Sequence, residues 1–366
     1  MDFTITDEQR ALAEATKGVL ARHGSPAAES GGSARPQDHD ARLWAALVEL
    51  GVPALPWSEA DGGLGGAWSD LALAATEVGR ARLGVPLAET AVAGHLVARL
   101  ADDALRAELL GALSEGSMLV VPALDEPGRS FDPIPHDVVA EETPEGWRLT
   151  GTKAPVRYAQ AADRAVVTAV TPMGTGVFVV EVGDRESDSL VLEAAPATLL
   201  ATGDDAEVAL EEALALGGVV LCAEALGAME EALRLTTDYL RTRKQFGVPL
   251  AAFQALTHRA ADMYVELELA RSATLFAAMV ADAASDGEPL DLDAVRRCRV
   301  VADKASRLVG QEAIQMHGGI GVTAEHPVGH LTARLTAISR TWGSTRRSLG
   351  RLGSTIADHR SVDVLG

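Results

Sequence analysis

The sequence is poor in cysteine, in basic residues and in long apolar runs. Its two cysteines, Cys222 and Cys298, both fall in segments that we interpret as buried helix. This placement fits reduced core thiols better than a disulfide framework. No uninterrupted apolar run reaches the roughly 18 residues of a membrane span, and acidic residues stand at the N-terminus where a signal peptide needs basic and apolar ones. We predict a cytoplasmic protein that binds no membrane.

Basic residues are outnumbered: 32 lysines and arginines stand against 52 acidic residues, for a formal net charge of −20. Nucleic acids and anionic membranes both need a cationic surface, so neither is an expected partner. The acidic residues fall mostly on predicted solvent faces of helices, where they favour solubility. Any anionic ligand must be held by a local group of donors.

Apolar residues are abundant, at 47% with a mean hydropathy of +0.10. The 366 residues exceed the usual size of a single core, so sub-domains are expected. Helical periodicity dominates both ends of the chain, and short β-rich runs with turn residues occupy the middle. We predict an α+β fold: an N-terminal helical domain at 1–115, a small middle β-barrel domain at 116–205, and a C-terminal four-helix bundle at 206–366.

The N-terminal third opens with a capping-box pattern. Thr6 and Gln9 have the spacing at which each side chain caps the other residue's backbone N–H, so the first helix should begin near Asp7. A Gly/Ser/Pro-rich loop is predicted at 25–36. Further amphipathic helices are predicted at about 39–51, 69–82, 88–101 and 103–114.

A first motif, RKQFGVPL, occupies 243–250 of the predicted bundle. Arg243 offers a forked donor to a pyrophosphate, Phe246 offers an apolar wall, and Gln254 offers amide hydrogen bonds. If the segment continues as a helix, these residues and Leu250 fall on about one face. The alternative is a structural turn with an exposed arginine.

A second motif, QMHGGIG, occupies 315–321 and is followed by EHPV at 325–328. Adjacent glycines let the backbone approach a ligand closely, and the alternative is a helix C-cap. A predicted helix rather than a strand precedes these glycines, so the motif is not a Rossmann fingerprint.

Together the two motifs resemble the RxQFG and QxHGGxGxxxExPV signatures of the acyl-CoA dehydrogenases. Weaker similarities at 61–65, 77–80, 149–153 and 162–163 extend the resemblance over nearly the whole chain. In that family these elements contact the ADP half of an FAD bound in the neighbouring subunit. The resemblance therefore implies an FAD shared across the subunit interface, with these cofactor-binding residues: Arg243, Phe246, Leu250, Gln254, Gln315, Met316, Gly318 and Gly319.

The resemblance also indicates a missing catalytic base. Family members remove the proton α to the thioester with a glutamate, so a correctly placed carboxylate is indispensable. An ungapped comparison from the second motif places Trp342 at that position, and a one-residue slip places Gly343 there. In members that carry the base on the first bundle helix, the corresponding position is Gly217 or Gly218. None of these side chains accepts a proton, so we predict no catalytic residue in this chain.

Residues that would hold the flavin ring within one subunit are altered as well. The family string TEPGxGSD has become DEPGRSFD at 125–132, and an aromatic residue with Ile-Thr has become APVRY at 154–158. The proline also removes a backbone donor. Features that act within a subunit are therefore lost, whereas those that act across the interface are kept.

We therefore predict a non-catalytic, FAD-site-completing subunit of a heteromeric α2β2 acyl-CoA dehydrogenase, similar to those of steroid side-chain degradation. The expected partners are a catalytic sister subunit, a bulky acyl-CoA substrate and an electron-transfer flavoprotein, and no metal is expected. One alternative is a homomeric flavoenzyme with a relocated base, for which Glu325 and Glu211 are poor candidates. Another is a flavin-free binding or scaffold protein. Glu211, Glu212 and Glu224 are all expected on solvated helix faces.

A basic segment closes the chain. Arg340, Arg346, Arg347 and Arg351 are concentrated in an otherwise acidic protein. They either face a phosphate of the cofactor or of CoA, or form a solvated helix face.

Overall fold

The computed structural model describes residues 5–23, 39–183, 187–343 and 345–358. The predicted loop at 25–36 lies outside these residues. The N-terminal part is helical, as predicted. Its helices are α1 (Asp7–His23), α2 (Ala41–Glu49), α3 (Trp68–Ala81), α4 (Leu87–Leu100) and α5 (Asp103–Glu115), with 3-10 turns η2 (Val52–Ala54) and η3 (Glu59–Asp61).

The start of α1 is capped as the sequence predicts. The Gln9 N–H donates to Thr6 Oγ1 over 3.2 Å, and the Thr6 N–H donates to Gln9 Oε1 over 3.1 Å. Two backbone donors of the first turn are thereby satisfied reciprocally, so the predicted capping box is confirmed.

The middle part is a sheet that closes on itself. Its strands are β1 (Val120–Ala123), β2 (Val139–Thr143), β3 (Gly146–Lys153), β4 (Arg164–Thr171), β5 (Gly174–Glu181) and β6 (Leu190–Thr202). They run in the order β1-β4-β2-β3-β6-β5, and an additional β4–β5 pairing completes a ring. Most residues of β4 and β5 are buried, so the ring is a small barrel with a packed interior, as predicted.

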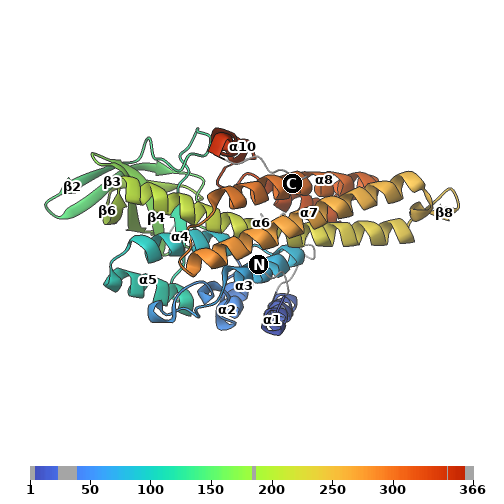
Figure 1. Cartoon of the computed structure of the whole chain (residues 1–366), viewed down its shortest axis with the longest axis horizontal. Helices are drawn as coiled ribbons and strands as arrows, with labels where there is room; N and C mark the ends of the chain where they lie inside the picture. The colour runs from blue at the N-terminus through green and yellow to red at the C-terminus, as the bar shows by residue number, and fades with distance from the viewer. Residues whose placement is uncertain (1–4, 24–38, 184–186, 344, 359–366) are drawn as a thin grey trace.

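The C-terminal part is the predicted helix bundle. It contains α6 (Asp204–Thr242), α7 (Gln254–Ser285), α8 (Leu292–His317) and α9 (Pro327–Ile338), and α10 (Thr345–Ser354) packs on α8. A hairpin of β7 (Lys244–Gln245) and β8 (Val248–Pro249) connects α6 to α7. The remaining 3-10 turns of the described residues are η4 (Leu250–Ala252), η5 (Gly318–Val322) and η6 (Ile356–Asp358). Figure 1 shows the barrel at one end of the molecule and β8 at the opposite end.

Helix α6 is the longest element and connects the two ends. Its 39 residues extend about 58 Å at 1.5 Å per residue, and it contacts α3, α4, α7, α8 and α9. By length and composition α6 could cross a membrane, but 78% of its most apolar window is buried inside the protein. This burial is typical of a core helix. A cytoplasmic location stays a prediction.

Glycines let α6 approach α3 at backbone contact. A Cβ on Gly79 of α3 would stand 1.8 Å from the Glu224 carbonyl oxygen, and a Cβ on Gly227 of α6 would stand 1.8 Å from that of Thr76. Neither distance is sterically possible, so the crossing requires glycine on both helices. These close contacts fix the position of α3 against α6 of the bundle.

The apolar core runs without interruption through the helices, the barrel and the bundle. Cys222 on α6 and Cys298 on α8 lie inside it, and both are buried and unbridged, as predicted. The element type changes between α5 and β1 and between β6 and α6, close to residues 115 and 205. That these two points are domain boundaries stays a prediction.

Candidate functional site

Two pockets lined by predicted site residues lie at opposite ends of α6. The first, the hairpin pocket, encloses about 500 Å³ and is formed by the ends of α6 and α8, the hairpin, the start of α7 and the turns η4 and η5. Its lining residues are Tyr239, Arg243, Gln245, Leu250, Leu256, Arg259, Gln315, Met316, His317, Gly318, Gly319 and Ile320. Six of the eight residues predicted to bind the cofactor are therefore brought together.

The remaining two predicted residues, Phe246 and Gln254, do not line this pocket. The expectation of one continuous helical face is wrong, because α6 ends at Thr242 and the chain reverses in the hairpin. Phe246 and Gly247 form its turn at φ values of 53° and 84°. Phe246 is 92% exposed, and Gln254 is the first residue of α7. The alternative of a structural turn is therefore correct for the backbone.

Arg243 supplies a free cation to the hairpin pocket. Its backbone is fixed at the end of α6: its N–H donates to the Tyr239 carbonyl over 2.9 Å, and its carbonyl accepts from the Leu250 N–H over 2.8 Å. The side chain is exposed, and no ion-pair partner for it occurs in the part of the chain that the structure describes. Arg259, the second cation, is paired with Glu312. Arg243 is thus the donor available to an anion.

The two glycines of the second motif open into the same pocket. Gly318 caps α8 at a φ of 63°, a conformation that favours glycine. A Cβ on Gly318 or on Gly319 would meet no atom within 4 Å. The predicted C-cap and the predicted close approach to a ligand are therefore compatible at this turn.

Sequence analysis missed an aromatic stack that lines the hairpin pocket. Tyr239 stacks on His317 with ring centroids 4.5 Å apart, and His326 lies 4.4 Å from His317 on the same measure. Burial lowers the pKa of His317, whose Nδ1 lies 2.8 Å from the Ala313 carbonyl. A neutral ring that donates from Nδ1 satisfies this geometry. One signal was available, since Tyr239 precedes Arg243 by about one helical turn.

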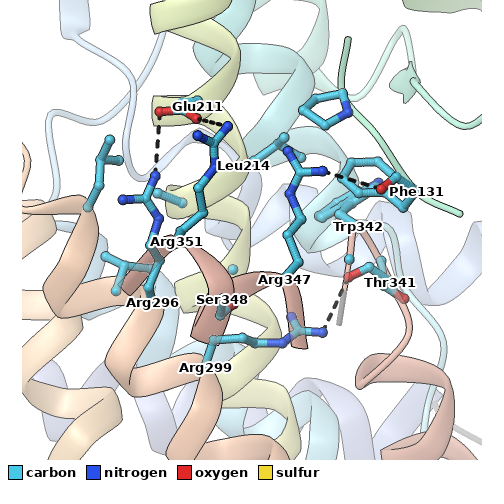
Figure 2. Close-up of a pocket in the computed structure, with 16 residues that line it drawn as sticks. Phe131, Glu211, Leu214, Arg296, Arg299, Thr341, Trp342, Arg347, Ser348 and Arg351 are labelled. Carbon is cyan, nitrogen blue, oxygen red and sulfur yellow. Dashed lines mark hydrogen bonds and ion pairs between the residues drawn. The ribbon is translucent and has the colours of Figure 1, made fainter. Parts of the chain in front are cut away.

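The second pocket, the enclosed pocket, lies at the barrel end of α6 and holds only about 110 Å³ (Figure 2). The barrel side contributes Phe131 and Pro133. The helices and the loop before α10 contribute Glu211, Leu214, Ala215, Gly218, Leu292, Val295, Arg296, Arg299, Thr341, Trp342, Gly343, Arg347, Ser348 and Arg351. Aromatic rings and arginine side chains thus occupy much of this region.

The single carboxylate among these lining residues is already neutralised. Figure 2 shows Glu211 between Arg296 and Arg351, at 3.4 and 3.2 Å. Arg299 donates to the Thr341 carbonyl over 3.3 Å. Glu211 therefore already has two cationic partners. The expectation that Glu211 lies on a solvated face is only partly met, since its side chain is 37% exposed.

Gly217 and Trp342, the residues predicted to stand in place of the family's base, lie against each other beside the enclosed pocket. A Cβ on Gly217 would lie 3.0 Å from Cζ3 of Trp342 and 2.3 Å from Cγ2 of Val92. Trp342 is half-buried and has a positive φ of 51°. The indole ring therefore fills the space in front of Gly217, and no larger residue fits there while the ring and Val92 stay in place.

Two buried ion pairs lie beside the enclosed pocket. Arg157 pairs with Glu89, and Arg334 pairs with Glu224 at 2.5 Å. Arg157 also donates to Thr341 Oγ1 over 3.4 Å, which connects this cluster to the pocket lining. The prediction that Glu224 lies on a solvated face is wrong: it is 5% exposed, because α6 is covered by α3 and α9 at this level. Burial raises the pKa of Glu224 despite the nearby Arg334.

The altered string at 125–132 has a structural role in the loop. Glu126 is buried and pairs with Lys153 at 3.0 Å, and it accepts the backbone N–H of His136, Asp137 and Val138. Burial raises the pKa of its neighbour Asp125 to about 6. The Glu126 carboxylate thus holds the loop against the barrel. The Asp125 carboxyl is buried beside it.

The four arginines of the basic C-terminal segment line two different cavities. Arg347 and Arg351 line the enclosed pocket, whereas Arg340 and Arg346 line a separate groove. Arg347 pairs with Asp132 at 3.5 Å. The four arginines therefore do not form one phosphate site. Across the described ranges, no group of three or more His, Cys, Asp or Glu side chains could hold a metal ion.

Comparison with known sequences identifies both helical parts of the chain. Residues 6–117 match the family described as "Acyl-CoA dehydrogenase, N-terminal domain", and residues 206–353 match "Acyl-CoA dehydrogenase, C-terminal domain". The chain is 31% identical over 355 residues to acyl-CoA dehydrogenase IpdE2 of Mycobacterium tuberculosis, with 97% of this chain and 99% of the relative covered.

Solved structures agree with these matches. The chain is similar to a chain in the structure of a variant of the Tcur3481-Tcur3483 steroid ACAD, with 32% identity, a TM-score of 0.84, and coverage of 97% of this chain and 99% of that one. It is also similar to a chain of the ChsE4-ChsE5 complex of Mycobacterium tuberculosis, with 27% identity, a TM-score of 0.85, and coverage of 99% and 100%.

Proposed function

The chain belongs to the acyl-CoA dehydrogenase family, and from that premise we propose that it is a non-catalytic subunit that completes the FAD site of a catalytic sister chain. The observation that carries the proposal is the contrast between its two pockets. The hairpin pocket is the larger of the two and offers an unpaired arginine, whereas the enclosed pocket is small and has no unpaired carboxylate among its lining residues.

The residues of the hairpin pocket fit the ADP half of FAD. Arg243 offers a planar donor that suits a diphosphate. Gln315 offers an amide, and the turn at Gly318 and Gly319 leaves space for close approach of a ligand. Tyr239 offers an aromatic surface. When bound, FAD supplies a hydride acceptor, and this chain would contribute binding and orientation.

The enclosed pocket supports the absence of a base in this chain. Trp342 and Gly217 occupy the two family positions and lie in contact, so the space for a catalytic carboxylate is filled at both. Glu211 is the remaining acidic group there, and it is held by Arg296 and Arg351. Glu325 is exposed and lies outside both pockets. A relocated base therefore has no good candidate among the described residues.

The separation of the pockets supports sharing between subunits. Glu211 at one pocket and Tyr239 at the other are 28 residues apart on α6, roughly 42 Å at 1.5 Å per residue. An extended flavin dinucleotide does not bridge that distance. A flavin whose ADP half binds in the hairpin pocket therefore does not place its ring system in the enclosed pocket of the same chain, and we propose that the ring lies in the sister subunit.

Exposed apolar side chains near the hairpin pocket support a protein partner there. Phe246 is 92% exposed, Val322 is 73% exposed and Ile320 is 42% exposed. Solvent-exposed apolar side chains grouped around a pocket are typical of interaction surfaces. We propose that the catalytic sister subunit of an α2β2 assembly covers them.

The proposed substrate class is a bulky acyl-CoA, with steroid side chains as the leading example. The support is the likeness to the structure described as a steroid ACAD and to a complex of two differently named chains. The sister subunit would supply the base and most of the acyl pocket, and an electron-transfer flavoprotein would accept the electrons. The reaction is α,β-dehydrogenation of the thioester.

The first test compares the flavin content of this chain purified alone with that of the chain co-expressed with a catalytic acyl-CoA dehydrogenase of the same genome. Absorbance and subunit stoichiometry should show FAD only in the complex. A lone chain that retains a full complement of FAD and turns over substrate would instead establish a self-sufficient enzyme. A complex without flavin would establish a scaffold.

A matched pair of variants sharpens the test. Arg243→Gln removes the proposed diphosphate donor, and the FAD affinity of the complex should fall roughly ten- to hundredfold. Arg241→Gln, two residues earlier on the last turn of α6 and 74% exposed, should leave flavin retention unchanged. Equal effects of the two variants would show that general charge, and not the hairpin pocket, holds the cofactor.

A further inference from the structure

A third cavity, the arginine groove, lies between α8, α9 and the first turn of α10. It encloses about 430 Å³ and shares no lining residue with the hairpin pocket or the enclosed pocket. Its lining residues are Asp303, Ser306, Arg307, Gln311, Thr332, Leu335, Thr336, Ser339, Arg340, Thr345 and Arg346. The groove thus collects three arginines from three separate segments of the chain.

These arginines differ from their neighbours in having no counter-charge. Arg307, Arg340 and Arg346 are exposed, and none makes an ion pair with any described residue. By contrast, Arg347 and Arg351 on the other side of α10 pair with Asp132 and Glu211. Three uncompensated cations around one groove are unexpected in a chain with a net charge of −20. The field inside the groove favours an anion.

The acidic residue of the groove does not neutralise it. Asp303 accepts a hydrogen bond from Arg299 over 3.3 Å and from Thr345 Oγ1 over 2.8 Å. Its side chain is only 6% exposed. Asp303 therefore forms part of the wall between the arginine groove and the enclosed pocket, and its charge is already compensated by Arg299.

The donors available to a ligand are the guanidinium groups and an amide. The hydroxyls of Thr332, Thr336 and Ser339 donate to backbone carbonyls of α8 and α9. Their protons are thus engaged. Arg307 and Gln311 stand one turn apart on α8, so both side chains lie along the same face. A ligand with several acceptor oxygens matches this set better than a neutral one.

We propose that the arginine groove binds a phosphate group of a phosphorylated small molecule. Planar guanidinium groups match phosphate oxygens in charge and in bidentate geometry. The phosphate could belong to the diphosphate of a nucleotide or to the 3′-phosphate monoester on the ribose of CoA, and the shared chemistry is a dianion. The proposal does not depend on the proposed FAD function, because the arginine groove and the hairpin pocket have no residue in common.

Titration calorimetry of the full chain with inorganic pyrophosphate tests this site. Arg340→Gln should weaken binding roughly ten- to hundredfold, and Arg307→Gln should do the same. Arg347→Gln removes the same charge from the opposite side of α10, and it should leave the affinity unchanged. The folding of each variant is checked by its thermal unfolding midpoint, and all three side chains are at least partly exposed, so the variants should fold.

Two results would overturn the proposal. Equal weakening by Arg347→Gln and Arg340→Gln would show diffuse electrostatic attraction without a defined site. Weakening by Arg243→Gln alone would place pyrophosphate in the hairpin pocket, which would leave the proposed FAD site intact while removing the arginine groove.

Competition experiments then identify the source of the phosphate. Displacement of pyrophosphate by ADP, dephospho-CoA and CoA alike would support a diphosphate ligand. Displacement by CoA alone would support recognition of its ribose 3′-phosphate monoester. Displacement by none of the three would contradict a phosphorylated nucleotide ligand.

Discussion

The hairpin pocket and the enclosed pocket use the same helix in opposite ways. Both contain arginines from the bundle, yet Arg243 at the hairpin end is unpaired among the described residues, whereas Arg296 and Arg351 at the barrel end are paired with Glu211. The volumes differ as well, at about 500 and 110 Å³. One end of α6 therefore has a larger cavity with an unpaired arginine, and the other has a smaller cavity whose carboxylate is paired.

The two ends of α6 also differ in what occupies the space beside the helix. Space at the barrel end is filled by the indole of Trp342 against Gly217 and by ion pairs such as Glu224 with Arg334. Glu224 and Arg334 thereby compensate each other's charge in the interior of the protein. At the hairpin end the corresponding compensation is missing, which favours binding of an anion.

The largest predicted effect concerns the packed end. Glu224→Gln removes the carboxylate that pairs with the buried Arg334 at 2.5 Å, and the free energy of unfolding should fall by about 3–5 kcal/mol. Urea unfolding measures this loss. The control is Glu231→Gln, which removes a partner of Arg234, a side chain that is 57% exposed, and should cost less than about 1 kcal/mol. A loss below that value for Glu224→Gln would mean that the packed end is looser than its contacts indicate.

The second prediction concerns pH. The pKa of Asp125 is raised to about 6 by burial, so its contribution to stability declines as pH rises from about 4 through 6. Asp125→Asn should therefore stabilise the protein at pH 7.5, by up to about 3 kcal/mol, and have little effect at pH 4. Thermal unfolding across this range measures the difference.

A control for Asp125 lies on the same loop. Arg129 lowers the pKa of Asp137, so the stability that Asp137 contributes is present at neutral pH and is lost as pH falls. Asp137→Asn should destabilise the protein at pH 7.5, with the opposite sign. A gain from Asp125→Asn that does not depend on pH would contradict the proposed cause.

The third prediction uses two adjacent glycines of α6. Gly217→Ala should destabilise the protein by about 1–3 kcal/mol, because its Cβ would overlap Val92 and crowd Trp342. Gly218→Ala should stabilise it by up to about 1 kcal/mol, since its Cβ would meet only Val295 at 3.9 Å and alanine favours the helix. Equal effects of the two substitutions would show that Trp342 does not fill the space at Gly217.

The smallest predicted effect on stability concerns Phe246, at the tip of the hairpin. Phe246 is 92% exposed, so Phe246→Ala should change the free energy of unfolding by less than about 0.5 kcal/mol. The same variant should weaken association with the sister subunit, measured by co-purification or by sedimentation. Unchanged association would remove the hairpin tip from the proposed interface.

Much of this architecture was predictable because its signals are local. The capping box at Thr6, the strand runs of the barrel and the long periodic helices each depend on neighbouring residues. The two motifs also identified six residues that line the hairpin pocket. The error lay at Phe246, where a glycine-containing turn interrupts a pattern that is also compatible with a helix.

Local patterns could not indicate which charges would be buried. Glu224 and Arg334 are 110 residues apart in the chain, and their pairing depends on how α6 and α9 pack. The division of the basic segment between Arg346 and Arg347 depends in the same way on where α10 packs against α8.

The sequence by itself determined the order of helices and strands, the family and six of the residues that line the hairpin pocket, because each of these follows from short runs of residues. The tertiary structure alone decided that Trp342 covers Gly217, that Glu224 is buried and that three arginines share one groove. The physical reason is that such contacts join distant segments. Their free energy depends on the burial and pairing that exist only once the helices have packed.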